Sequence, residues 1–201
     1  MEDRKLNEKE SLELIAQMIQ NSKKNVDQNA GGPVLIWGYA TILISFLVYA
    51  AWMFVQQPVV MLGWLLIPVF GGLGNLWLAR GRKPVLITTH LDRVIKNIWL
   101  VMGSVTVAMS LTAFIFPLPI LFFIGILCGA SITLTGCVAD NKVYKYCGIS
   151  GMLLSFLCLL VKGPEQILIF AGVFFVMMVI PGHILNAEIR KQAKSGRTEI
   201  I

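Results

Sequence analysis

Residues Ile120–Val138 read ILFFIGILCGASITLTGCV, a continuous apolar run without a charged side chain. A helix of roughly 20 such residues crosses the ~30 Å hydrocarbon core of a bilayer. Other runs of similar length and character occur before and after it. The predicted spans are 34–55, 59–79, 98–116, 120–138, 143–161 and 167–185. The sequence therefore predicts an all-α integral membrane protein with six transmembrane helices.

The composition argues against a soluble globule. Of 201 residues, 56% are hydrophobic and only 14% are charged, which is more apolar surface than a globule of this size can bury. No predicted span contains Asp or Glu, and Lys145, one turn into the fifth, can extend its stem toward the headgroups. The runs are continuous rather than alternating, so helices are expected and a transmembrane barrel is not.

The positive charge lies on one side of these spans. All 17 Lys and Arg residues except Lys162 fall in the N-terminal tail, around the loops after the second and fourth spans, or in the C-terminal tail. The positive-inside rule therefore places both termini in the cytoplasm. This orientation, with attraction to anionic lipid, accounts for the formal net charge of +6 without nucleic-acid binding.

The spans are expected to form three helical hairpins with very short outer turns. Each outer turn contains proline, which ends one helix and can begin the next. These turns are Gln56-Gln57-Pro58, Pro117-Leu118-Pro119 and Lys162–Glu165. The expected organisation is a cytoplasmic segment over 1–33, a six-helix domain over 34–186 and a basic cytoplasmic tail over 187–201.

Residues Glu8–Val26 are predicted to form an amphipathic helix before the first span. Its apolar positions follow helical spacing, and its candidate partner-binding residues are Leu12, Ile15, Met18 and Ile19. The segment Asp27–Pro33 is expected to break this helix. Three interpretations are open: the helix lies in the headgroup region or against the inner loops, docks a protein partner, or associates with a second copy.

Small residues recur at helical spacing in the fourth and fifth spans. They are Gly125, Gly129, Thr133 and Gly136 in the fourth, and Gly148, Gly151, Ser155 and Cys158 in the fifth. In lipid, helix association depends on close backbone approach, which such faces allow. We expect these two spans to pack face to face, or one of the faces to form a dimer.

The inner ends of the second and sixth spans offer a candidate ligand site. Pro68 and the glycines after it could kink or unwind the second span, and Pro181-Gly182 lies at similar depth in the sixth. Together they could line an inward-facing polar pocket with a titrating histidine. The candidate residues are Gly71, Gly72, Gly74, Asn75, His183 and Asn186. The simpler alternative is that these residues only bend or end packed helices.

Residues suited to catalysis are scarce. The chain has 2 His and no acid within a predicted span, too few groups for most catalytic constellations or for a proton- or sodium-coupled path. Thr89–Asp92 matches a helix-capping box, so His90 and Asp92 indicate a helix start rather than a metal pair. Cys128, Cys137, Cys147 and Cys158 lack metal-ligand spacing. We expect no enzyme activity, no metal and no cofactor.

Three stretches resemble uncharacterised small six-span bacterial inner-membrane proteins: ESLELIAQMI at Glu10–Ile19, GGP at Gly31–Pro33 and LIWGY at Leu35–Tyr39. The resemblance implies a bacterial inner-membrane location but no function. The sequence favours a non-catalytic interaction or regulatory module whose partners are lipid, a cytoplasmic or membrane protein bound through residues 8–26, or a second copy. The alternative is a facilitator or binder of a small molecule or lipid, and a membrane enzyme is the least supported class.

Overall fold

The computed structural model describes residues 8–80, 90–113 and 115–188, with side chains from residue 31 onward. Every regular element in those ranges is a helix, which confirms the all-α prediction. Six of the described helical stretches are long and apolar enough to cross a membrane. They are Gly31–Val55, Pro58–Arg80, His90–Ala113, Ile120–Val138, Lys142–Leu160 and Glu165–Glu188. The predicted basic tail lies almost wholly outside the described residues.

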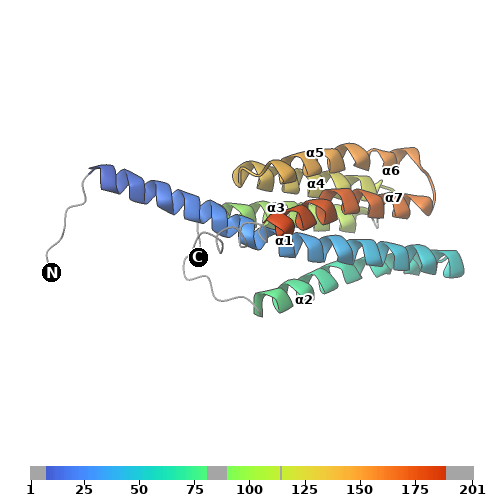
Figure 1. Cartoon of the computed structure of the whole chain (residues 1–201). Helices are drawn as coiled ribbons and strands as arrows, with labels where there is room; N and C mark the ends of the chain where they lie inside the picture. The colour runs from blue at the N-terminus through green and yellow to red at the C-terminus, as the bar shows by residue number, and fades with distance from the viewer. Residues whose placement is uncertain (1–7, 81–89, 114, 189–201) are drawn as a thin grey trace.

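The first helix, α1, runs from Glu8 to Val55 without interruption (Figure 1). The break expected at Asp27–Pro33 is absent, and Pro33 lies inside the helix. A proline removes one intrahelical hydrogen bond, and membrane helices tolerate that gap where a neighbouring helix supports the segment. Such support is present because Gly31 lies against Asn186 of the sixth span. Residues 8–30 therefore extend the first span beyond the bundle.

The second span begins differently from the expectation. It opens as a 3₁₀ helix, η1 (Pro58–Leu65), and continues as α2 (Leu66–Arg80). Pro68 lies in the first turn of α2, directly after η1, and does not end the helix. The predicted unwinding at the glycines after Pro68 is therefore absent, because α2 continues as regular helix through them.

The third span, α3 (His90–Ala113), begins where the capping box predicts but ends earlier than expected. The predicted end was Phe116, whereas the N–H of Phe116 donates to the carbonyl of Thr112 in a turn. Pro117 follows directly, and a proline disfavours helical conformation in the residue before it. The outer turn between the third and fourth spans is therefore somewhat longer than predicted.

The core lies between α1, α4 (Ile120–Val138), α5 (Lys142–Ser155), the short α6 (Leu157–Leu160) and the sixth span. The sixth span consists of α7 (Glu165–Phe174), the π-helical η2 (Phe175–Val179) and further helix to Glu188. The buried apolar cluster comprises Ile44, Val48, Leu121, Ile132, Tyr144, Cys158, Ile167, Phe170, Phe174, Met177, Met178 and Leu185.

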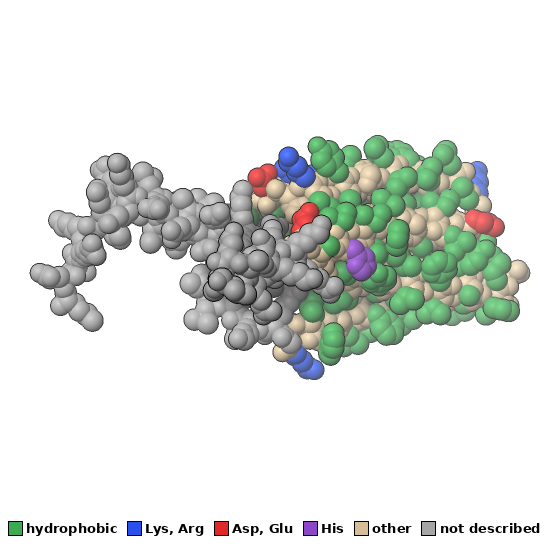
Figure 2. Space-filling model, viewed as in Figure 1, with side chains coloured by type: hydrophobic (Ala, Val, Ile, Leu, Met, Phe, Trp, Pro, Cys, Tyr) green, Lys and Arg blue, Asp and Glu red, His purple; other side chains and the backbone are tan. Residues whose placement is uncertain are grey.

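α2 and α3 lie at the periphery. α2 buries only Gly71, and α3 buries none of its residues. α2 packs on α1, on the side away from α5 (Figure 1), and α3 packs mainly on α4. Apolar side chains cover the flanks of the bundle and charged ones gather near its two ends (Figure 2). That distribution suits a domain surrounded by lipid.

Candidate functional site

The predicted residues of the second span pack against one face of α1. A Cβ atom added at Gly71 would lie 2.7 Å from the ring of Trp37, and one added at Gly74 would lie 2.6 Å from Cγ2 of Ile36. Both glycines therefore let the α2 backbone approach α1 closely. Gly72 faces away from the other helices, since a Cβ atom there would meet nothing within 4 Å.

Asn75 follows these glycines and carries a buried polar atom. Its side-chain Oδ1 is shielded from solvent and accepts no hydrogen bond from any residue in the described part of the chain. An unpaired buried acceptor costs roughly 1–3 kcal/mol. Asn75 is thus the residue of α2 whose chemistry is least explained by helix packing.

His183 and Asn186 of the sixth span meet another part of α1. Asn186 lies against Gly31, where an added Cβ atom would come within 2.5 Å of the Asn186 Oδ1. His183 shares a hydrogen bond with Tyr39, whose Oη lies 2.7 Å from the His183 Nε2. The two rings meet edge to face, with centroids 6.0 Å apart. Both rings are exposed, so this polar pair lies on the flank of the bundle.

The structure does not gather the six predicted pocket residues at one site. Ile36 and Trp37 of α1 meet α2, whereas Gly31 and Leu35 meet the sixth span. α1 therefore lies between the two halves of the predicted pocket (Figure 1). Gly71 and Gly74 permit close helix packing, in line with the simpler interpretation, whereas Gly72 does not contribute to it.

The small-residue faces of the fourth and fifth spans meet in the most extensive helix contact of the bundle. A Cβ atom added at Gly129 would lie 3.0 Å from the carbonyl oxygen of Gly148, and the reverse distance is 2.8 Å. Thr133 lies against Gly148, and Ser155 lies against Gly125. The two faces cover each other, so this stretch is not free to form a dimer.

The other small residues extend this contact. Gly136 lies against the Tyr144–Lys145 backbone, and Gly151 turns toward Met177 of η2. Four hydroxyl groups on α4 and α5 donate to carbonyls four residues back, so they need no partner on another helix. These hydroxyls belong to Ser131, Thr133, Thr135 and Ser155. The small-residue faces pack the two helices closely together.

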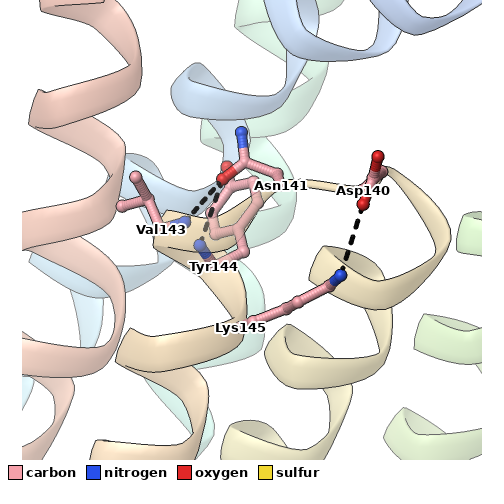
Figure 3. A network of polar contacts seen from close by, with 5 residues as sticks. All are labelled: Asp140, Asn141, Val143, Tyr144 and Lys145. Atoms are coloured by element: carbon pink, nitrogen blue, oxygen red, sulfur yellow. Dashed lines mark hydrogen bonds and ion pairs between the residues drawn. The ribbon is translucent and has the colours of Figure 1, made fainter.

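The turn between α4 and α5 fixes their relative position (Figure 3). Asp140 has a φ of 55°, and the Asn141 N–H donates to a carbonyl in the last turn of α4 at 2.8 Å. The Asn141 side chain accepts hydrogen bonds from the N–H groups of Val143 and Tyr144 at 3.0 and 3.2 Å, which caps α5. The Lys145–Asp140 ion pair, 3.4 Å long and partly exposed, adds little.

The remaining predicted sites lie at the edges of the described chain. Leu12, Ile15, Met18 and Ile19 lie on the helical backbone of α1, but their side chains are outside the described residues, as is Thr89. His90 and Asp92 lie in the first turn of α3, as a helix start requires. Within the described ranges no three His, Cys, Asp or Glu residues gather as metal ligands, and the cysteines are free thiols.

The predicted sites omit the α1 residues that organise the bundle. Trp37 covers Gly71, Gly38 admits Met178 and Val179 of η2, and Tyr39 pairs with His183. The spacing of Gly31, Leu35 and Gly38 along α1 is the signal that could have revealed this face, since residues four and three apart share one side of a helix.

Comparison of the chain with known protein families, with curated proteins and with solved structures found no match. The resemblance to six-span bacterial inner-membrane proteins therefore stays a prediction. The functional argument rests on the geometry of the chain itself.

Proposed function

We propose that the protein is a non-catalytic multi-pass membrane protein that acts as an interaction or regulatory module, with its partner-facing surface in the cytoplasm. The proposal rests on the continuity of α1. One helix from Glu8 to Val55 is both the first span and the segment that extends beyond the bundle (Figure 1). A partner bound to its projecting part, residues 8–30, would act directly on a helix of the core.

The membrane half of α1 is well placed to transmit such binding. It contacts η1 and α2 on one side and α7 and η2 on the other. Thr41, Ile44, Ser45 and Val48 are all buried in these contacts. A displacement of α1 would therefore reach both peripheral and central helices of the bundle.

The projecting part also carries apolar positions that would face water unless a partner covered them. Leu12, Ile15 and Ile19 recur at helical spacing, which is typical of a helix that docks in a groove or pairs with another helix. At 1.5 Å per residue, residues 8–30 reach roughly 35 Å from the start of the span. A helix that leaves the bundle along the line of its own span points away from the headgroups, which favours a protein partner over lipid.

The cytoplasmic placement is supported by charge. Arg80, Lys142 and Lys145 stand at helix ends on the side where α1 leaves the bundle, whereas Lys162 lies in an outer turn. The positive-inside rule then assigns the projecting part to the cytoplasm. The proposed setting is a bacterial inner membrane, with both termini inside and the spans paired as three hairpins.

The facilitator or small-molecule binder is the weaker proposal. It requires the inner ends of the second and sixth spans to share a cavity, and there the two spans lie against different faces of α1. A membrane enzyme is weaker still, because His183 shares its hydrogen bond with Tyr39, a residue that the predicted sites did not include.

Affinity purification in mild detergent tests the proposal. The intact protein is compared with a chain lacking residues 1–28 and with full-length Leu12→Ser/Ile15→Ser/Ile19→Ser. The matched control, Gln17→Ser/Gln20→Ser/Asn21→Ser, changes the opposite face by the same number of residues. We expect a protein identified by mass spectrometry to remain with the intact and control chains and to be lost from the other two.

Recovery of the same proteins from all four chains would contradict the interaction proposal. A lipid or small molecule that survives washing, and is lost from both Asn75→Ala and His183→Ala, would instead favour the binder. These two outcomes are distinguishable because neither pocket residue lies in the projecting part of α1.

A further inference from the structure

Two weak points in neighbouring helices lie side by side. One is Gly31–Pro33 in α1, and the other is Pro181-Gly182 in the sixth span. A Cβ atom added at Gly31 would lie 3.2 Å from the carbonyl oxygen of Gly182, and one added at Gly182 would lie 3.3 Å from that of Gly31. The helices therefore touch backbone to backbone where each carries its proline.

Each helix lacks an internal hydrogen bond at this level. Pro33 has no N–H to donate to the carbonyl of Asn29, and its ring crowds that carbonyl. Pro181, which is fully buried, likewise has no N–H to donate within the sixth span. Sharp bends in helices occur at such prolines and at π turns.

The sixth span is also widened just before Pro181. In η2 the N–H of Ile180 donates to the carbonyl of Phe175, five residues back, as in a π-helix. Met177 of this turn lies against Gly151 of α5, which fixes the turn to the core. Beyond it, Gly182 lies against Leu35 of α1. The widened turn thus separates a segment held by the core from a segment held by α1.

We propose that these paired segments form one joint, at which α1 and the sixth span bend together. The projecting part of α1 and residues 180–188 move as one rigid unit relative to the rest of the bundle. The joint belongs to the fold itself, so it stands whichever partner binds the projecting part.

The Tyr39–His183 hydrogen bond stabilises the arrangement in which α1 and the sixth span pack together without bending. It spans the two helices on the lipid-facing flank, with 2.7 Å between Oη and Nε2. Asn186 against Gly31 makes a second contact on the cytoplasmic side of the joint. Loss of one such hydrogen bond shifts a two-position balance by about fivefold.

Pulsed EPR distances in lipid nanodiscs test the joint. Nitroxide labels replace Gln20 on the projecting part and Leu134, an exposed residue of α4, in a full-length chain whose four native cysteines are substituted. We expect a broad distance distribution, which Pro33→Ala/Pro181→Ala narrows by restoring both N–H donors. Each single substitution achieves most of this narrowing, because the helices bend together. Pro68→Ala, in the first turn of α2, is the matched control and leaves the distribution unchanged.

Tyr39→Phe is a milder variant that keeps the ring and removes the hydrogen bond to His183. We expect it to raise the bent component about fivefold. The distance distribution between labels at Ile184 and Leu134 should change in the same way as the one between Gln20 and Leu134. Gln20 and Ile184 belong to the same rigid unit. Equal widths in the parent and Pro33→Ala/Pro181→Ala chains would overturn the joint. Additive effects of the single substitutions, or a change confined to one label pair, would overturn it as well.

Discussion

The third and fifth spans are equally apolar on average, yet they differ completely in burial. α3 buries none of its residues, whereas α5 buries Tyr144, Gly148, Gly151 and Ser155. α5 packs against the glycines of α4, while the outward-facing Gly103 of α3 has no neighbour within 4 Å. The difference teaches that, between two spans of equal hydropathy, close packing of small residues distinguishes the one that enters the core from the one that stays at the periphery.

The largest loss of stability is expected from a substitution that fills the space between α4 and α5. Gly129→Leu should lower stability by about 3 kcal/mol, since even a Cβ atom there would lie 2.6 Å from Cγ of Met152. Thermal unfolding in detergent measures the effect. Gly103→Leu is the matched control and should leave the midpoint unchanged, because nothing lies within 4 Å. Equal losses in the two variants would refute the assignment of the core.

A smaller effect is expected where α2 meets α1. Gly71→Ala places a Cβ atom 2.7 Å from the Trp37 ring, which must shift. We expect a loss of about 1–2 kcal/mol, less than at Gly129, because the Trp37 ring is only partly buried and has more room to shift. Gly72→Ala, with open space around it, should show no loss in the same unfolding assay. If Gly72→Ala were the more damaging change, the faces of α2 would be wrongly assigned.

The turn between α4 and α5 should tolerate less change at its cap than beside it. Asn141→Ala removes two hydrogen bonds to the start of α5 and should cost about 1 kcal/mol. Asp140→Gly relieves a positive φ of 55° and removes an exposed ion pair of little worth, so its midpoint should fall by less than that of Asn141→Ala. A larger loss at Asp140 than at Asn141 would show that the ion pair, not the cap, holds the turn.

The smallest expected change concerns Asn75. Asn75→Leu replaces a buried oxygen that no described residue satisfies with an apolar group of similar size. Stability should be unchanged or higher by up to about 1 kcal/mol, because no hydrogen bond is lost. A clear loss of stability would mean that the amide has a partner, and would revive the pocket proposed for the inner end of α2.

Much of the fold can be read from local sequence. The six spans depend on length and apolar character, and both are properties of a single stretch. The α4–α5 contact is also accessible, because a short turn makes the spans neighbours and the spacing of Gly125 and Gly129 marks the face. In both cases the relevant physics acts within about twenty residues.

The candidate site could not be predicted in the same way. The break expected at Asp27–Pro33 follows local rules, but packing of Gly31 against Asn186 keeps α1 continuous. The π turn of η2 has no distinct composition and sits where Gly38 and Gly151 hold the sixth span from two sides. The inner ends of the second and sixth spans lie against different faces of α1, a long-range arrangement that no single stretch of sequence specifies.

The central claim is that α1 is one helix that carries a cytoplasmic surface into the core. Pulsed EPR between labels at Gln20 and Leu43, in nanodiscs, tests it most directly. A continuous helix separates these positions by about 35 Å, and moderate bending at Pro33 shortens this by only about 1 Å. A helix that turns at Pro33 to lie along the headgroups would give about 25 Å. The account predicts a distribution centred near the longer distance, and one centred near the shorter distance would contradict it.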